Sequence, residues 1–268
     1  MNPDSDIMKK AALLDRPDIL RFLFHPRKAH AVSPQEHVSE VALQAGDNTV
    51  IGCRLHMVGQ NNPNLLFFHG NGEIAHDYDS LGPLYNKAGL NFIVADYRGY
   101  GISTGNPSVS AMFTDAYAVF EHISRMLQDS GHTGPMWIMG RSLGSAPAIE
   151  LAAAFQTRVA GLIVESGFAE VRGLLERLGI LPRDLAAAPE SELFSNAETL
   201  KGFKGPVLII HAEKDDIIPL RHGITLHESA GGTRKEIRII HNADHNNILG
   251  IAGMAYFDYI REFVGGRS

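Results

Sequence analysis

Short apolar runs that end in turn residues recur along the chain, and longer stretches with helical spacing of apolar positions separate them. Continuous apolar runs of this length are typical of strands buried on both faces of a sheet. Strands that alternate with helices form βαβ units, so the pattern predicts an α/β fold, a mostly parallel central sheet with helices on both faces. The predicted strands of this kind span residues 64–70, 90–99, 135–140, 160–166, 206–212 and 235–241.

Two earlier segments, residues 37–45 and 49–58, follow a different pattern. Apolar and polar positions alternate more regularly in both, and no helical stretch lies between them. This combination is typical of antiparallel strands. We therefore expect an antiparallel edge on the N-terminal side, which brings the sheet to about eight strands.

Two stretches between strands predict helices. Residues 108–128 carry apolar side chains at helical spacing, with Ser108 or Ser110 as the candidate N-cap. Residues 144–155 form a helix of small residues, in which Pro147 is tolerated only in the first turn. The second helix therefore begins close to residue 142.

The segment from residue 168 to residue 205 is too long for a plain connection between two strands. Pro182 and Pro189 interrupt its helical pattern. We interpret it as a small helical lid over the C-terminal edge of the sheet, where α/β proteins bind ligands. Alternatively, its apolar residues belong to the main core. These residues are Leu174, Leu175, Leu178, Ile180, Leu181 and Leu185.

The first 37 residues predict a helical extension that precedes one α/β domain of residues 38–268. Within this extension, residues 18–28 have the apolar spacing of a short amphipathic helix. We expect this helix to pack on the body of the protein; the alternative is a weak anchor for a surface or a partner. The apolar run after Lys9 and Lys10 is too short for the core of a signal peptide.

Composition narrows the class of protein. The 268 residues carry a net charge of −6 and no dense run of Lys or Arg, which disfavours binding to nucleic acid or to an anionic membrane surface. No stretch reaches the length of a transmembrane helix, so we expect a cytoplasmic protein with no integral membrane contact. Cys53 is the only cysteine and is expected to be a small buried hydrophobic residue.

Ser142 is the first candidate for chemistry, because it lies in the sequence Gly-Arg-Ser-Leu-Gly between a predicted strand and a predicted helix. Gly140 and Gly144 permit a tight turn that lifts the serine hydroxyl above the end of the strand. The same turn directs the backbone N–H of Leu143 towards that space, beside a helix N-terminus. Ser142 is therefore a candidate nucleophile, provided that a base lies beside it.

The base is expected on a loop after the last strand, at the same edge of the sheet. Of the 13 histidines, His241 and His245 lie there. His241 directly ends the apolar run, whereas His245 follows in a polar loop, so we choose His245. A carboxylate that orients the imidazole is expected after an earlier strand. The candidates are Glu213, Asp215 and Asp216, with Glu165 as a further alternative.

Taken together, these segments resemble the α/β-hydrolase superfamily, from about residue 38 to the C-terminus. The branch with the strongest resemblance contains small depalmitoylase-like and Bem-type serine hydrolases. The resemblance implies that Asp215 is the acid and His245 the base, and that the N–H groups of Leu143 and Asn71 form the oxyanion hole. The matching motifs are HGNG at 69–72, DYRGYGIS at 96–103, GRSLGS at 140–145, HAEKDDIIP at 211–219 and NADHNN at 242–247.

Arg141 and Phe168 are the candidate substrate-binding residues. Arg141 either fixes the turn around Ser142 or binds a substrate carboxylate, and Phe168 follows a strand end where substrates bind. The spacing of His241 and His245 does not suit a metal pair, because the two residues fall on a strand end and a loop. No Gly-x-Gly-x-x-Gly follows the first strand. We therefore expect no metal and no cofactor.

The sequence thus predicts a serine hydrolase that cleaves an ester or thioester of a small or acyl-chain substrate through a covalent acyl-enzyme. Acyl transfer and peptide hydrolysis use the same three side chains and stay open. A binding protein without catalysis is the alternative of another class. Nothing in the chain indicates the oligomeric state.

Overall fold

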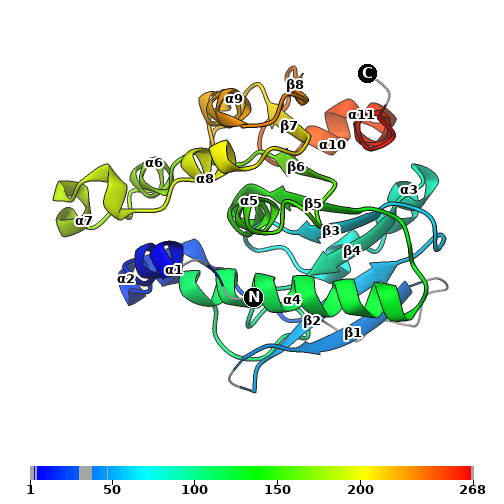
Figure 1. Ribbon diagram of the computed structural model, residues 1–268. Coiled ribbons are helices and arrows are strands. Elements are labelled where there is room, and N and C mark those ends of the chain that lie inside the picture. The colour runs from blue at the N-terminus through cyan, green and yellow to red at the C-terminus, as the bar shows by residue number, and fades with distance from the viewer. Residues whose placement is uncertain (1–2, 4, 30–37, 47, 267–268) are drawn as a thin grey trace.

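The computed structural model describes residue 3 and residues 5–29, 38–46 and 48–266 (Figure 1). Its centre is a single eight-stranded sheet. The strands are β1 (Val38–Gln44), β2 (Val50–His56), β3 (Asn64–Phe68), β4 (Asn91–Ala95), β5 (Met136–Arg141), β6 (Gly161–Glu165), β7 (Val207–Ala212) and β8 (Lys235–Ile240). Their order across the sheet is β1-β2-β4-β3-β5-β6-β7-β8.

The register confirms the predicted fold class. β2 pairs antiparallel with β1 and with β4, and every other neighbouring pair is parallel. The predicted strands differ from the observed ones mainly at their ends. The run predicted for 90–99 stops at Ala95, because the chain turns at Gly99, whose φ of +79° suits a residue without a side chain.

Helices cover both faces of the sheet. They are α1 (Ser5–Ala12), α2 (Pro17–Leu23), α3 (Gly82–Lys87), α4 (Val109–Asp129), α5 (Ser145–Ala154), α6 (Val171–Arg177), α7 (Arg183–Ala187), α8 (Asn196–Gly202), α9 (Leu220–Ser229), α10 (Ile248–Ala252) and α11 (Met254–Val264). Short 3₁₀ turns lie at η1 (Ala75–Tyr78), η2 (Ser142–Gly144) and η3 (Glu190–Glu192).

The two faces bury separate clusters of apolar side chains. Successive strand residues alternate between them, as the pleat of a strand requires: Leu66 and Phe68 join one cluster, and Leu65 and Phe67 join the other. The first cluster contains residues of α4, α5 and α8, and the second contains residues of α3, α10 and α11 (Figure 1). The inner strands β3, β4, β6 and β7 are therefore covered on both sides, which explains their continuous apolar sequences. The last strand, β8, was predicted to be buried on both faces but is only half-buried, because it lies at the edge of the sheet.

The two helices predicted between strands are present. Ser108 caps α4, and its Oγ accepts a hydrogen bond from the backbone N–H of Ala111 at 3.1 Å. Asp15 also caps this helix, since its Oδ1 accepts from the N–H groups of Val109 and Ser110. In α5, Pro147 lies in the first turn.

The segment from residue 168 to residue 205 forms α6, α7, η3 and α8. Leu174, Leu175 and Leu185 are buried in the main core, whereas Leu178 is 41% exposed. The segment thus contributes to the core and also leaves apolar surface outside it. That it moves as a lid stays a prediction.

The N-terminal helices pack on the domain. Ile7, Ala11, Ile19 and Leu23 all belong to the core cluster that contains α4. The helix predicted for 18–28 is shorter, because α2 ends at Leu23 and the chain is extended from Phe24. Residues 30–37 lie outside the described residues, so the boundary between extension and domain stays a prediction. In the described part of the chain, no helix combines the length and apolarity that crossing a membrane requires.

Candidate active site

Ser142 lies in a tight backbone turn between a strand and a helix. It follows β5 directly, has a φ of +51°, and is followed by η2 and α5. A Cβ atom at Gly140 would lie 2.2 Å from the carbonyl oxygen of Gly144, and one at Gly144 would lie 2.1 Å from that of Phe68. These contacts explain both glycines and hold the serine above the end of the strand.

The structure brings together Ser142, His245 and Asp215. His245 Nε2 lies 3.0 Å from Ser142 Oγ, and His245 Nδ1 lies 2.8 Å from Asp215 Oδ2. A carboxylate only accepts hydrogen bonds, so Nδ1 carries the proton and Nε2 is left to accept from the serine hydroxyl. All three side chains are buried. This arrangement suits a serine nucleophile, its general base and an orienting acid.

Asp215 is held in its ionised form. Its Oδ1 accepts hydrogen bonds from the backbone N–H groups of Ile217 and Ile218, at 3.1 and 2.7 Å. Burial alone would raise the pKa of Asp215, but the hydrogen bond and charge of His245 outweigh it, and the pKa is lowered. An ionised carboxylate in this position stabilises the imidazolium that forms when His245 takes a proton.

The other candidate acids lie elsewhere. Glu213 is exposed and accepts from the N–H of Asn242, and Asp216 is exposed as well. Glu165 is paired with Arg141 through Nε at 3.0 Å. His241, the alternative base, is exposed and lies 3.3 Å from Glu213. Of these candidates, it is Asp215 that contacts His245, and His245 that contacts Ser142.

His211 supports this arrangement, although it was not predicted as a site residue. It is fully buried beneath the acid loop, the segment of residues 213–219 between β7 and α9 that carries Asp215. Its Nε2 lies 2.8 Å from the carbonyl oxygen of Ile218 and 3.6 Å from Asp215. Burial lowers the pKa of His211, which favours the neutral ring. Its position at the head of the motif HAEKDDIIP was the only signal in the sequence.

The side chain of Asn71 fixes the loop in which this residue lies. Asn71 Oδ1 accepts hydrogen bonds from the backbone N–H of His25 at 2.9 Å and from the hydroxyl of Tyr100 at 2.8 Å. Asn71 and Leu143 line the same cavity as Ser142. Both residues therefore border the cavity that the serine borders, while their role as oxyanion donors stays a prediction.

A cavity of about 240 Å³ opens over Ser142. Its walls come from both ends of the chain. Residues of α2 and the segment after it contribute, as do α6, the acid loop and the loop of residues 241–247 that carries His245. The lining residues are Phe22, Leu23, His25, Asn71, Glu73, Arg141, Ser142, Leu143, Leu174, Leu178, Ile217, Ile218, His245 and Asn246. The contribution of the N-terminal helix was not predicted.

Phe168 lies apart from this cavity. It is 1% exposed, belongs to the main core and packs against Phe194 with 6.2 Å between ring centroids. It is not among the residues that line the cavity over Ser142. The structure therefore gives no support to the predicted contact of Phe168 with substrate.

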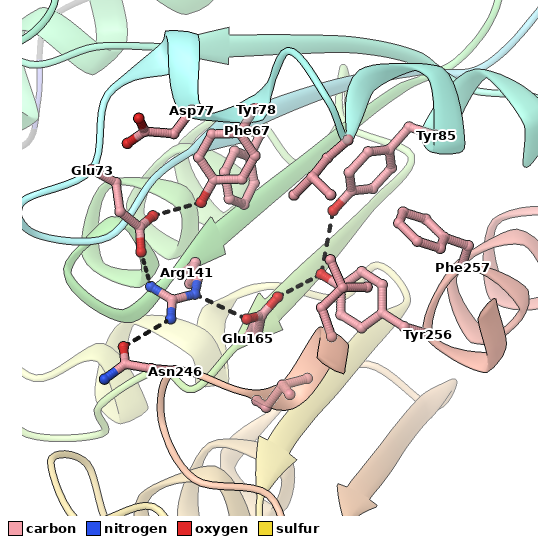
Figure 2. Close-up of a pocket in the computed structure, with 13 residues that line it drawn as sticks. Phe67, Glu73, Asp77, Tyr78, Tyr85, Arg141, Glu165, Asn246, Tyr256 and Phe257 are labelled. Carbon is pink, nitrogen blue, oxygen red and sulfur yellow. Dashed lines mark hydrogen bonds and ion pairs between the residues drawn. The ribbon is translucent and has the colours of Figure 1, made fainter. Parts of the chain in front are cut away.

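Arg141 joins a network of charged side chains at the edge of the site. Figure 2 shows its guanidinium between Glu73 and Glu165, with Asn246 beside it. Its Nη2 also donates to the backbone carbonyl of His245 at 2.8 Å. Burial alone would lower the pKa of Arg141, but the two carboxylates outweigh it and raise the pKa. These partners favour a fixing role for Arg141 over binding of a substrate carboxylate.

The network borders a second cavity of about 280 Å³. Glu73 also accepts from the hydroxyl of Tyr78, and Glu165 accepts from that of Tyr256, both at 2.5 Å (Figure 2). Glu73 and Tyr256 were not predicted, because their link to Ser142 passes through residues distant in the chain. Cys53 is buried, as predicted, and burial raises the pKa of its thiol. Within the described residues, no group of three or more potential ligands is placed to hold a metal ion.

Comparison with known families gives one match that covers more than half of the chain. The sequence profile of the family described as serine aminopeptidase, S33, within the α/β-hydrolase superfamily, matches residues 59–197. This range includes the turn at Ser142 and the loop at Asn71, and it ends before Asp215 and His245.

Several curated proteins are similar over most of this chain. Protein bem46 of Schizosaccharomyces pombe is 28% identical over 207 residues, which cover 76% of this chain and 68% of the relative. The uncharacterized membrane protein YNL320W of Saccharomyces cerevisiae is 31% identical over 204 residues, which cover 72% of this chain and 67% of the relative. The lysophosphatidylserine lipase ABHD12 of Rattus norvegicus is 30% identical over 193 residues, covering 66% and 48%. The alignments thus span half to two thirds of these relatives.

Solved structures share the fold at low sequence identity. The Pyrococcus furiosus esterase Pf2001 superimposes with a TM-score of 0.71 at 14% identity, covering 90% of this chain and 98% of the esterase. Est1E of Butyrivibrio proteoclasticus, solved with ferulic acid, gives a TM-score of 0.70 at 16% identity, covering 84% and 99%. These likenesses support the fold.

Proposed function

Since the chain belongs to the serine aminopeptidase S33 family of α/β-hydrolases, we propose that it is a serine hydrolase that cleaves carboxylic esters or thioesters. The observation that carries the proposal is the hydrogen-bonded chain from Ser142 Oγ through His245 to Asp215, at 3.0 and 2.8 Å. It lies at the base of a cavity that a substrate can enter.

The reaction has two steps. His245 Nε2 takes the proton of the Ser142 hydroxyl as Oγ attacks the acyl carbonyl, and the N–H groups of Leu143 and Asn71 hold the resulting oxyanion. His245 then gives that proton to the leaving alcohol or thiol, which leaves the acyl group on Ser142. In the second step His245 takes a proton from water and the hydroxide attacks the acyl-enzyme. His245 then returns the proton to Ser142 Oγ as the carboxylic acid is released.

The walls of the cavity suggest the kind of substrate. Leu23, Leu174 and Ile218 make much of it apolar, which suits an acyl chain. Its volume of about 240 Å³ lies just below the range of about 300–1,000 Å³ that is usual for ligand pockets. We therefore expect short or medium acyl groups to be preferred. The printed activity of one relative, a lysophosphatidylserine lipase, also supports an acyl ester.

The test combines a fluorophosphonate probe with p-nitrophenyl esters of increasing chain length. We expect wild-type protein to be labelled at Ser142 and to show an optimum at short or medium chains. Ser142→Ala and His245→Ala should lose labelling and turnover while they remain folded. Absence of labelling and of turnover in folded wild-type protein would instead support a binding role.

Peptide hydrolysis is the second candidate, because the matching family is described as serine aminopeptidase. The same three side chains serve both reactions. Aminoacyl p-nitroanilides separate the two: turnover of these amides faster than of the matched esters would make the protein a peptidase. The cytoplasmic location stays a prediction.

A further inference from the structure

We propose that Arg141, clamped between Glu73 and Glu165, positions the loop that carries His245 and so keeps the imidazole in reach of Ser142. This inference rests on the proposed function, since it concerns the base of the same site. Arg141 is a positioning residue here: it acts through the backbone of His245.

The geometry links the nucleophile and the base through one side chain. Arg141 is the residue before Ser142, so its backbone is part of the same turn. Its Nη2 donates to the carbonyl oxygen of His245 at 2.8 Å. One arginine thus joins the end of β5 to a loop 104 residues further along the chain.

The two carboxylates determine where the guanidinium points. Glu165, at the end of the neighbouring strand β6, accepts from Nε at 3.0 Å, and Glu73 accepts from Nη1. Two charged acceptors on separate sides leave Nη2 directed at His245, because the guanidinium is a rigid planar group. The tyrosine hydroxyls of Tyr78 and Tyr256 fix the carboxylates in turn.

Stability alone does not account for this network. Buried ion pairs are often replaced by apolar residues without loss of stability, because removing charges from water costs much of what their attraction returns. Arg141 borders the second cavity (Figure 2) as well as the cavity over Ser142, so apolar packing does not enclose the side chain on every side. Its charged partners must hold it, which is what a positioning role requires.

The experiment compares wild type with Arg141→Ala and Arg141→Lys. We expect the fluorophosphonate to label Ser142 about 10- to 100-fold more slowly in Arg141→Ala, because a small displacement of the base has effects of this size. Low concentrations of guanidinium ion should restore part of the rate in Arg141→Ala. Arg141→Lys should stay slow, since an ammonium group cannot reach three acceptors in one plane.

Arg158→Ala is the matched control. Arg158 forms two hydrogen bonds with Glu121, at 2.9 and 3.1 Å, on the surface away from the site. Its removal should leave the labelling rate unchanged, with no response to guanidinium ion. The downfield NMR signal of the proton between His245 Nδ1 and Asp215 supplies a second readout. We expect it to broaden or vanish in the Arg141 variants and to persist in Arg158→Ala.

A folded Arg141→Ala protein that is labelled at the wild-type rate and keeps the downfield signal would overturn the inference. If Arg141→Ala does not fold, Glu165→Gln takes its place, because it retains the side-chain volume. It should label several-fold more slowly, and a wild-type rate would overturn the inference equally. If wild type is not labelled at all, the proposed function fails, while the NMR comparison still tests the position of His245.

Discussion

The nucleophile and the base of this site are positioned in different ways. Ser142 is fixed by backbone, since β5, the turn and α5 are consecutive in the chain and Gly144 touches β3 directly. His245 lies on a loop that side chains hold, with Asp215 on one side and Arg141 on the other. A short motif can therefore encode the serine, whereas the histidine depends on residues far apart in the sequence.

The largest expected effect comes from disturbing the side chains that hold His245. In Asp215→Asn, the amide oxygen can keep the bonds from Ile217 and Ile218, and the NH₂ group then faces His245 Nδ1. Nδ1 must accept, so Nε2 carries the proton and cannot take another from Ser142. We expect kcat to fall about 10⁴-fold with little change in stability.

Asp216→Asn is the control, because this exposed neighbour offers the same charge change outside the site. Steady-state ester hydrolysis and urea denaturation of both variants provide the measurement. Similar losses of kcat in the two variants would refute the assignment of Asp215 as the acid.

Gly144→Ala tests the backbone turn that positions Ser142. The added Cβ would lie 2.1 Å from the carbonyl oxygen of Phe68, so the turn or β3 must shift. We expect the free energy of unfolding to fall by about 1–3 kcal/mol. Labelling of Ser142 should decline together with stability. Both are measured on the same samples, by urea denaturation and by the fluorophosphonate.

Gly202→Ala is the matched substitution, because a Cβ there meets nothing within 4 Å. Gly202 ends α8, and alanine is the better residue for a helix. We expect this variant to gain about 0.5–1 kcal/mol of stability and to keep wild-type labelling. Equal destabilisation by the two variants would contradict the importance of close packing at the turn.

The free energy of unfolding should depend on pH through His222, which lies in the helix that follows the acid loop. His222 of α9 is buried, and its Nδ1 accepts from the N–H of Ala169 at 3.3 Å. Burial lowers the pKa of His222 to about 4 from the ordinary 6.5. The unfolded chain binds this proton first as pH falls, so the stabilisation is complete above pH 6.5 and is lost towards pH 4.

We expect wild type to lose about 1–2 kcal/mol more than His222→Gln between pH 7 and pH 4, a value reduced from the full linkage because the site is not completely shielded from water. Urea denaturation at several pH values measures the difference. Parallel curves for the two proteins would show that His222 does not titrate differently on folding.

The smallest effect concerns the mouth of the cavity. Leu178 lines it and is 41% exposed, so Leu178→Ser should change stability by no more than about 0.5 kcal/mol. We expect KM to rise about two- to fivefold for the longest ester that is turned over, because less apolar surface covers the chain. Ile224→Ser, at 40% exposure but away from the cavity, should leave KM unchanged. A KM that is independent of Leu178 at every chain length would exclude it from the acyl path.

The sequence by itself determined the fold and the nucleophile turn. Strands buried on both faces have continuous apolar runs, and the glycines around Ser142 report local contacts, so both features can be read from neighbouring residues. His245 and Asp215 were chosen over His241, Glu213 and Asp216 from their places after strands and from the resemblance of their motifs to a known family.

Only the tertiary structure decided which distant side chains complete the site. It placed Phe22 and Leu23 of the N-terminal helix on the cavity wall, and it buried Phe168 in the core. It also directed Arg141 to the carbonyl of His245. These outcomes depend on how helices pack against the sheet edge and on which charges meet there, and the spacing of residues along the chain does not encode such long-range contacts.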